Sequence, residues 1–353
     1  MSVLNADEVI AAGLAAGLDA VGVASAEPFE STRVTLLERR ERGLHGGMAF
    51  TYRNPDRSTD AARTVPGAQS LVVGALGYRS SAPAAPDRAA GRVAAYARSD
   101  HYAKLRALLG HIAEMLRGGG HKAVVVADDN ALVDREAARR AGLGWYGKNS
   151  NILLPGLGSW FVLGTVITTA ALEPSTPVPD QCGPCRRCLD GCPTGAIVAP
   201  GVVDARRCLA WLVQADGDFP LEFREALGDR IYGCDDCQEV CPPNRLAESN
   251  GPGAGEGLND DAAWVDLVDL LELDDDELMA RYGRWYIPRR EPRYVRRNAL
   301  IALGNSGRGA DPEVVDPEVI DIVHRYLSDP DPMLARHAEW AARRLGAGAV
   351  TPV

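Results

Sequence analysis

All eight cysteines of this 353-residue chain lie in one short window, between Cys182 and Cys241. The window opens with the pattern Cys-x2-Cys-x2-Cys-x3-Cys-Pro, formed by Cys182, Cys185, Cys188 and Cys192. Short x2 loops let three thiolates converge on one cluster, and the fourth cysteine of such a run binds a second cluster. The spacing therefore indicates iron–sulfur chemistry of the ferredoxin type.

A second run ends in the same way, with Cys234, Cys237 and Cys241 before a proline, and Cys208 is the remaining candidate for its missing member. Eight cysteines provide the ligands of two 4Fe–4S clusters. Exchange of the last cysteines assigns one cluster to Cys182, Cys185, Cys188 and Cys241, and the other to Cys192, Cys208, Cys234 and Cys237. The alternative pairs each run with its own last cysteine. We prefer the exchange because it brings the clusters close enough for electron transfer.

Zinc is the alternative metal, since soft thiolates also bind it in groups of four. Zinc ribbons usually show two separated Cys-x2-Cys pairs, whereas three cysteines follow here at successive x2 spacings. Two neighbouring clusters conduct electrons, either in a carrier protein or toward a reaction centre elsewhere in the chain. The window is a small part of the 353 residues, so the pattern favours a reaction centre.

Alternating helices and strands precede the cysteine window. The hydrophobic pattern predicts a helix near the N-terminus and further helices at 100–116 and 133–141. Short apolar runs predict strands at 20–24, 70–76, 123–127 and 160–168. This alternation predicts an α/β domain at residues 1–175, which is followed by a ferredoxin-like domain at 176–250. The assignment of cobalamin binding to the first domain rests on the resemblance described below.

The C-terminal part, residues 251–353, opens with a reversal of charge. Residues 256–277 contain ten acidic and no basic side chains, and residues 281–298 contain seven arginines and one acid. Guanidinium groups suit phosphate oxygens, so we predict RNA contacts here. The candidates are Arg289, Arg290, Arg293, Arg296 and Arg297, with Trp285, Tyr286 and Tyr294 to stack on unpaired bases. The alternative is a solvated face that pairs with the acidic segment.

Helical segments recur near the C-terminus. Residues 297–302 resemble residues 336–341 at an offset of 39, with a helix predicted at 317–327 between them. A period of about 40 residues is typical of HEAT-type repeats, which predicts a HEAT-like α-helical domain. A plain helical bundle is the alternative.

The composition excludes several classes of protein. Hydrophobic residues make up 46% and charged residues 24%, which excludes bulk disorder, and the net charge of −10 argues against a uniform coat on nucleic acid. The N-terminus lacks a basic and apolar leader, and the apolar runs are shorter than the ~20 residues that span a bilayer. We therefore expect a cytoplasmic protein without membrane contact, in which clustered cysteines bind metal.

Several segments around these features resemble epoxyqueuosine reductases, namely residues 128–135, 141–149, 158–161, 192–197, 204–208 and 232–238. The resemblance covers nearly the whole chain. It implies an oxidoreductase of tRNA processing that uses cobalamin and two 4Fe–4S clusters. Such an enzyme reduces epoxyqueuosine at the wobble position of tRNA to queuosine, the last step of queuosine biosynthesis. We expect a monomer that receives electrons from an unidentified low-potential donor.

The resemblance also implies site residues. The family's catalytic aspartate precedes the Ala-Gly pair at 141–142 by thirteen residues, which corresponds to Asp128, with Asp129 as a neighbouring alternative. A carboxylic acid kept protonated by desolvation suits proton donation to an opening epoxide, whereas the alternative role is a helix cap. The implied cofactor-binding residues are Arg57, Asp128, Lys148 and Asn149. The corrinoid motif Asp-x-His-x-x-Gly is absent from the sequence, so histidine ligation of cobalt by that route is not expected.

Two other classes fit parts of this pattern. An electron carrier with an interaction platform would bind clusters but neither a corrinoid nor tRNA. A cytoplasmic reductive dehalogenase would bind a corrinoid, but the arginine-rich helical end counts against it.

Overall fold

The computed structural model describes residues 4–78, 84–245, 260–306 and 316–346. The chain divides into two compact units, each assembled from three stretches. The N-terminal unit comprises Met1–Arg79, Asp100–Asp204 and Asp236–Glu256, and the C-terminal unit comprises Ser80–Ser99, Ala205–Asp235 and Gly257–Val353. This division differs from the predicted boundaries, because the cysteine window does not pack as a unit of its own. Its short loops hold few apolar side chains and bury them on both neighbours.

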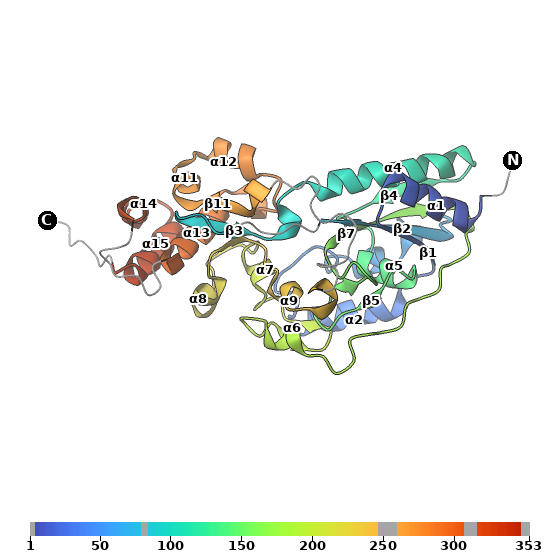
Figure 1. Ribbon diagram of the computed structural model, residues 1–353, viewed down its shortest axis with the longest axis horizontal. Helices are drawn as coiled ribbons and strands as arrows, with labels where there is room; N and C mark the ends of the chain where they lie inside the picture. Colours follow the sequence, from blue (N-terminus) through green and yellow to red (C-terminus); the bar gives the residue numbers. More distant parts are fainter. Residues whose placement is uncertain (1–3, 79–83, 246–259, 307–315, 347–353) are drawn as a thin grey trace. The chain divides into compact units, whose positions relative to one another are not determined.

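Four antiparallel strands form the central sheet of the N-terminal unit, in the order β1-β2-β7-β4 (Figure 1). The strands are β1 (Ala20–Ser25), β2 (Ser70–Gly77), β4 (Ala123–Val126) and β7 (Phe161–Thr168). They lie at the four predicted positions. Their antiparallel pairing is the difference from a typical alternating α/β chain, in which the strands run parallel.

Helices cover both faces of this sheet. On one face α4 (His101–Gly118) approaches so closely that Leu109 fills the space where Gly74 and Gly164 have no side chain. On the other face Ala137 and Ala138 of α5 (Asp134–Arg140) share a buried cluster with β2 and β7. Because both faces are covered, β2 and β7 are buried along nearly their whole length, and their sequences are continuous apolar runs.

The remaining elements of the N-terminal unit are short, apart from two helices. They are α1 (Ala6–Ala16), α2 (Glu30–Glu41), α3 (Pro55–Ser58), a 3-10 turn (Ala61–Arg63), α6 (Arg187–Asp190) and α9 (Asp236–Glu239). Two hairpins complete it, β5 (Trp145–Tyr146) with β6 (Ile152–Leu153), and β8 (Ile197–Ala199) with β9 (Val202–Val203).

The C-terminal unit combines a small sheet with helices. Its strands are β3 (Ala90–Val93), β10 (Arg230–Tyr232) and β11 (Trp264–Asp266), in the order β10-β3-β11. Its longer helices are α11 (Leu267–Glu272), α12 (Asp275–Tyr282), α13 (Arg293–Ser306), α14 (Pro317–Leu327) and α15 (Pro332–Arg344). Single turns occupy α7 (Leu209–Leu212), α8 (Arg224–Leu227), Ala95–Ala97, Leu221–Phe223, Asp260–Ala263 and Pro288–Arg290.

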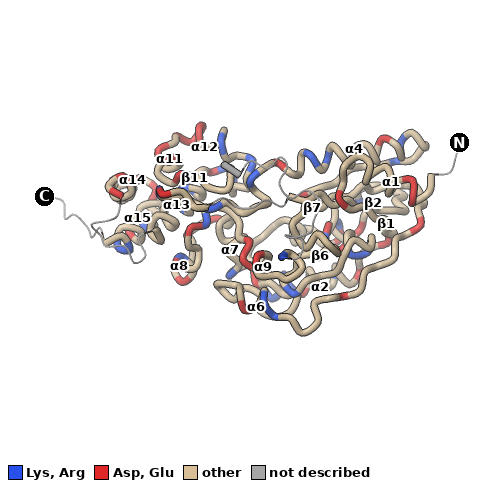
Figure 2. The backbone as a smooth tube through the Cα atoms, in the orientation of Figure 1, with Lys and Arg blue, Asp and Glu red and all other residues tan. Residues whose placement is uncertain are grey.

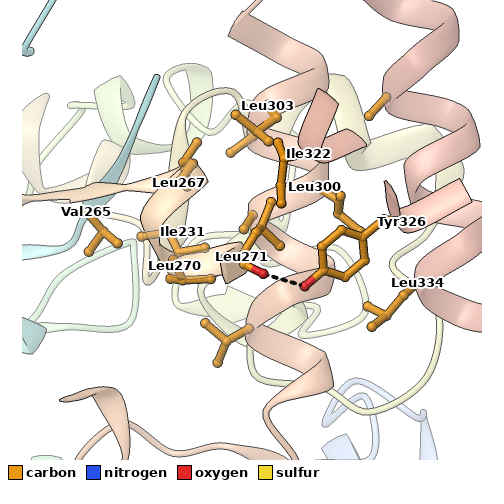
Figure 3. Packing of buried hydrophobic residues seen from close by; sticks show 14 of the residues in the cluster. Ile231, Val265, Leu267, Leu270, Leu271, Leu300, Leu303, Ile322, Tyr326 and Leu334 are labelled. Atoms are coloured by element: carbon orange, nitrogen blue, oxygen red, sulfur yellow. Dashed lines mark hydrogen bonds between the residues drawn. The ribbon is translucent and has the colours of Figure 1, made fainter. Parts of the chain in front are cut away.

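One hydrophobic core joins the small sheet to the helices of this unit. Figure 3 shows Ile231 and Val265 from the strands in one packed cluster with Leu300 of α13. The Tyr326 hydroxyl, on α14, donates a hydrogen bond of 2.8 Å to the Leu271 carbonyl of α11. The bounds of α14 match the predicted helix at 317–327. No helix in the described ranges has both the length and the apolarity that crossing a bilayer requires.

His337 is a buried titratable group that this core keeps neutral. Its Nε2 accepts a hydrogen bond of 3.3 Å from the Phe219 amide, so its Nδ1 carries the proton and donates to the Met333 carbonyl at 2.7 Å. Burial is the main cause that lowers the His337 pKa from 6.5 to about 4. The positive charges of Arg224 and Arg297 add to this effect, whereas the hydrogen bond to Met333 and the charge of Asp218 oppose it.

We expect this histidine to make the folded state sensitive to acid. Because the pKa of His337 is lower in the folded state than in the unfolded state, the unfolded chain binds the extra proton. The stabilisation from the neutral histidine is therefore complete above pH 6.5 and is lost as pH falls toward 4. The loss should reach on the order of 3 kcal/mol. Urea titrations of wild type and His337→Gln at pH 7 and pH 4.5 measure it. An equal loss in the variant would contradict the assignment.

Candidate active site and cysteine loops

Four of the cysteines come together within the N-terminal unit. Cys241 is buried against Trp145 and Leu153, and Cys182 packs against the same cluster. Burial, together with the nearby thiols of Cys188, Cys182 and Cys185, raises the Cys241 pKa to about 11, against the opposing effect of a hydrogen bond from the Asn244 backbone. The last cysteine of the second run therefore lies close to the first three of the first run, as the exchanged assignment requires.

The other four cysteines are distributed between the units. Cys192 and Cys237 belong to the N-terminal unit, and Cys208 and Cys234 belong to the C-terminal unit. The Cys192 sulfur accepts a hydrogen bond of 3.2 Å from the Ala196 amide. Among the described residues no three His, Cys, Asp or Glu side chains lie close enough to share a single metal ion.

Lys148 and Asn149 hold the cysteine loops. Both lie in the turn between β5 and β6, where Ser150 has a positive φ of 65°. The Lys148 ammonium donates to the carbonyls of Gly183 at 2.6 Å and Cys185 at 2.8 Å. The buried Asn149 amide donates to the Cys237 carbonyl at 3.2 Å. The two predicted cofactor contacts thus bind the backbone of both cysteine runs.

A buried amide network holds the end of the second run. Asn244 is fully buried and donates to the Gln238 carbonyl at 2.8 Å, while its side-chain oxygen accepts from the Ser159 amide at 2.6 Å. The Gly158 backbone has φ +64°, and a Cβ there would lie 2.0 Å from the Asn244 oxygen. Gln238 and Asn244 were not predicted as site residues. The only feature of the sequence that could have indicated them is their position beside Cys237 and Cys241.

The predicted acid lies where β4 ends. Asp128 has a left-handed backbone, with φ 53°, which is uncommon for a residue other than glycine and recurs at functional sites. The Asp129 carboxylate accepts a hydrogen bond of 2.7 Å from the Ala131 amide and so caps the following turn. No hydrogen bond to the Asp128 carboxyl is present among the described residues. Neither aspartate caps α5, whose N-cap is Val133 without a side-chain hydrogen bond, so the Asp128 carboxyl is not engaged as a helix cap.

Several titratable groups surround Asp128. Although Asp128 keeps an exposed surface, the protein around its carboxyl removes enough water to raise its pKa, against an opposing effect of Arg106. Burial together with the Asp128 charge raises the Asp134 pKa well above its usual range. Burial and the same two carboxyls also raise the Tyr102 pKa. The carboxyls of Asp128 and Asp134 thus both keep a proton to higher pH than an ordinary aspartic acid does.

Arg106 positions this group. Its guanidinium donates a hydrogen bond of 2.8 Å to the Ala127 carbonyl, and its Cζ lies 5.8 Å from the centre of the Tyr102 ring. Tyr102 and Arg106 are one helical turn apart on α4, so both reach the end of β4 from one helix face. Tyr102, Arg106 and Asp134 were not predicted as site residues. The helical spacing of Tyr102 and Arg106, on a helix opposite the end of a strand, is the feature that could have indicated the first two.

The arginine-rich segment divides into buried and exposed members. Arg297 is completely buried and donates to the carbonyls of Leu212 at 3.0 Å and Ala215 at 2.9 Å. The prediction that Arg297 contacts RNA is therefore wrong, because its guanidinium satisfies the backbone of the segment that contains α7. Trp285 and Tyr294 are also buried, so the prediction that they stack on bases is wrong too.

The alternative of pairing with the acidic segment holds for Arg296. Its side chain is 12% exposed and lies 2.5 Å from the Asp275 carboxylate. Figure 2 shows acidic residues, coloured red, along α11 and α12, and Asp275 belongs to α12. Arg289, Arg290 and Arg293 keep exposed guanidinium groups, and the first two have left-handed backbones with φ 51° and 61°.

Two cysteine runs of ferredoxin spacing, together with a carboxyl group of raised pKa, define an iron–sulfur oxidoreductase. Residues 181–244 match the family model of the 4Fe-4S double cluster binding domain, which confirms the predicted cluster type. The chain is 33% identical to epoxyqueuosine reductase of Bacillus cereus, over 97% of this chain and 90% of that protein. It is 34% identical to epoxyqueuosine reductase of Vibrio cholerae, over 95% and 90%. The chain belongs to the epoxyqueuosine reductase family.

Solved structures agree with this assignment. A crystal structure of epoxyqueuosine reductase with a tRNA-Tyr epoxyqueuosine-modified stem loop has a TM-score of 0.85 at 31% identity, over 96% of this chain and 90% of that chain. The structure of epoxyqueuosine reductase from Streptococcus thermophilus has a TM-score of 0.86 at 28% identity, over 98% and 91%.

We expect Lys148→Met to weaken retention of the clusters. The change keeps the aliphatic stem but removes two charge-assisted hydrogen bonds to the loop of Cys185, each contributing about 1.5–3 kcal/mol. Iron per chain, measured after anaerobic gel filtration and again after brief exposure to air, should fall faster than in wild type. Lys122→Met is the matched control, because its exposed side chain makes no described hydrogen bond. Equal iron loss in the two variants would contradict this role.

Arg297→Met should destabilise the protein by about 3–5 kcal/mol, because it leaves buried carbonyls without a donor. The midpoint of urea unfolding measures this effect. The matched change Arg293→Met, at a half-exposed position, should cost less than about 1 kcal/mol. If Arg297→Met were as stable as wild type and selectively lost RNA affinity, the buried role would be refuted.

Proposed function

We propose that this chain reduces epoxyqueuosine at the wobble position of tRNA to queuosine, the last step of queuosine biosynthesis. The observation that carries the proposal is similarity over nearly the whole chain to epoxyqueuosine reductases, including one solved with an epoxyqueuosine-modified stem loop. The double cluster domain at 181–244 supplies the redox chemistry that such a reduction needs. Incubation of reduced enzyme with epoxyqueuosine-containing tRNA, followed by nucleoside analysis, tests it.

The reaction fixes what the protein must provide. Removal of the epoxide oxygen as water breaks two carbon–oxygen bonds, forms a carbon–carbon double bond and consumes two electrons and two protons. Cobalamin and the two clusters supply the electrons when bound, and a low-potential donor replenishes them. The ligands that we propose are Cys182, Cys185, Cys188 and Cys241 for one cluster and Cys192, Cys208, Cys234 and Cys237 for the other. The mutual proximity of the first four thiols supports this division.

The chain's own residues supply a proton. We assign the acid to Asp128, whose carboxyl pKa is raised by burial and by the neighbouring Asp129. An alkoxide left without a proton in a dry site is unfavourable, so a carboxylic acid at this point lowers the barrier. The Asp134 carboxyl, whose pKa is raised well above its usual range by burial and by the Asp128 charge, is a further source.

Cobalamin binding is assigned to the N-terminal unit on family membership. Of the predicted contacts, Arg57 lies exposed on α3, and the polar groups of Lys148 and Asn149 are engaged with the cysteine loops. The described residues are thus suited to hold the clusters, but they do not by themselves identify which residues contact a corrinoid. No step of the account depends on a particular contact to that group.

For tRNA binding we retain the exposed arginines Arg289, Arg290 and Arg293, together with Tyr286, which is 57% exposed. Guanidinium groups and an unstacked aromatic ring suit an anticodon loop, whose phosphates and splayed bases are both accessible. Helices α13 and α15 contain the two similar segments and pack on each other, which supports a HEAT-like arrangement.

Asp128→Asn should abolish most turnover while leaving the rest of the enzyme intact. The amide keeps the shape but has no acidic proton, so the single-turnover rate should fall by roughly 10²–10⁴-fold. Iron content and RNA affinity should stay at wild-type values. Asp129→Asn is the control and should cost much less, because an amide oxygen can still accept from the Ala131 amide. The reverse order of effects would transfer the acid to Asp129.

Cys241→Ala should remove one cluster and spare the other. Wild type should hold roughly eight iron atoms per chain, and the variant roughly four. In the exchanged assignment Cys192→Ala affects the opposite cluster, so the two variants should show different electron paramagnetic resonance spectra. Identical residual spectra would contradict the division of ligands.

A further inference from the structure

A cationic cleft lies on the N-terminal unit, apart from the carboxyl group at Asp128 and from the cysteine loops. It has a volume of about 350 Å³ and is open to solvent. Its walls come from the end of α2 and the loop that follows, and the lining side chains used here are Arg40, His45, Met48, Tyr52 and Arg53. No acidic residue lines it, although the chain as a whole carries a charge of −10.

Two hydrogen bonds and a glycine shape the backbone around the cleft. Arg53 donates its amide hydrogen to the Ala49 carbonyl at 2.6 Å, so residues 49–53 form one helical turn. The Arg40 guanidinium donates to the Tyr52 carbonyl at 3.3 Å and joins that turn to α2. Gly47 has φ +81°, and a Cβ there would meet nothing within 4 Å.

The cations of the cleft lack carboxylate partners. Within the described part of the chain, neither Arg40 nor Arg53 forms an ion pair, and the hydrogen bond of Arg40 goes to a backbone carbonyl. The buried His45 Nδ1 has no hydrogen-bond partner among the described residues. Two guanidinium groups in a lining without carboxylates are the surroundings that a phosphate oxygen prefers.

The cleft also has an aromatic wall. The rings of His45 and Tyr52 lie 5.5 Å apart between centroids at 43°. A phenol face beside a thioether provides a surface on which a base can stack, and stacking on aromatic side chains contributes about 1–3 kcal/mol per base. Phosphate and base recognition therefore occur side by side.

We propose that this cleft binds one nucleotide of the substrate RNA, with its phosphate between Arg40 and Arg53 and its base against Tyr52. The inference rests on the proposed function for the identity of the RNA. It adds an RNA contact on the N-terminal unit, distinct from the arginines of the C-terminal unit. The same chemistry, a phosphodiester next to a base, also occurs in the nucleotide tail of cobalamin, so the test separates the two sources.

The test uses the holoenzyme and a synthetic anticodon stem-loop RNA, with the dissociation constant measured by fluorescence anisotropy at several salt concentrations. Arg53→Glu should weaken binding about tenfold or more and reduce the salt slope by about one, because one phosphate contact is lost. Tyr52→Ala should weaken binding about five- to a hundredfold without changing the salt slope. Lys122→Glu, the same charge change outside the cleft, should alter neither. Iron content and melting temperature verify the fold of each variant.

A parallel titration of cobalamin-free enzyme with cobalamin, followed by absorbance, identifies the alternative source. If Arg53→Glu weakens cobalamin binding and spares RNA binding, the cleft holds the cofactor's phosphate and the proposal is overturned. It is equally overturned if Arg53→Glu matches Lys122→Glu in both titrations. The proposed function has its own readout, since wild-type enzyme that converts no epoxyqueuosine would refute it whatever the cleft binds.

Discussion

The contact between the Lys148 ammonium and the carbonyls of the first cysteine loop is the interaction on which the rest of the site depends. Loops that carry closely spaced thiols have little apolar surface to bury, and their thiolates repel one another until a metal cluster binds them. Their shape must therefore come from other parts of the chain. The turn between β5 and β6 provides it, because Lys148 binds the first run and Asn149 binds the second.

The same stretch of chain connects the electron and proton sites. β4 ends at Val126, two residues before Asp128, α5 begins at Asp134, and β5 then leads into the turn that holds the cysteine loops. Both β4 and α5 contribute side chains to a buried cluster of the N-terminal unit. The proposed acid and the turn of Lys148 and Asn149 thus lie on one packed stretch of chain, which suits a reaction that needs both electrons and protons.

The sequence predicted the parts whose chemistry is local. Cysteine spacing identified the clusters, and continuous apolar runs located all four strands of the central sheet. Which arginines face solvent was not predictable, since Arg293, Arg296 and Arg297 lie on one helix and differ only in orientation. The alternative between Asp128 and Asp129 also required the structure, because the choice rests on a single hydrogen bond to the Ala131 amide.

Other features could not be predicted from the sequence, because they join residues that are far apart along the chain. Strand β3 packs with β10 and β11, more than a hundred residues away, and its four residues carry little pattern of their own. Tyr102 and Arg106 lie in the first two turns of α4 and meet the end of β4 only because this helix packs on the sheet. Asn244 reaches Ser159 across 85 positions, and no periodicity marks such a pair.

The central claim is that a carboxylic acid, held protonated beside like charges, delivers a proton during epoxide opening. Its most direct test is the pH dependence of the single-turnover rate, measured with chemically reduced holoenzyme and epoxyqueuosine-containing stem-loop RNA. The account predicts a rate that is constant at low pH and falls as pH rises through the elevated carboxyl pKa, because only the protonated form donates. A rate that rises with pH, or a fall that persists unchanged in Asp128→Asn, would contradict it.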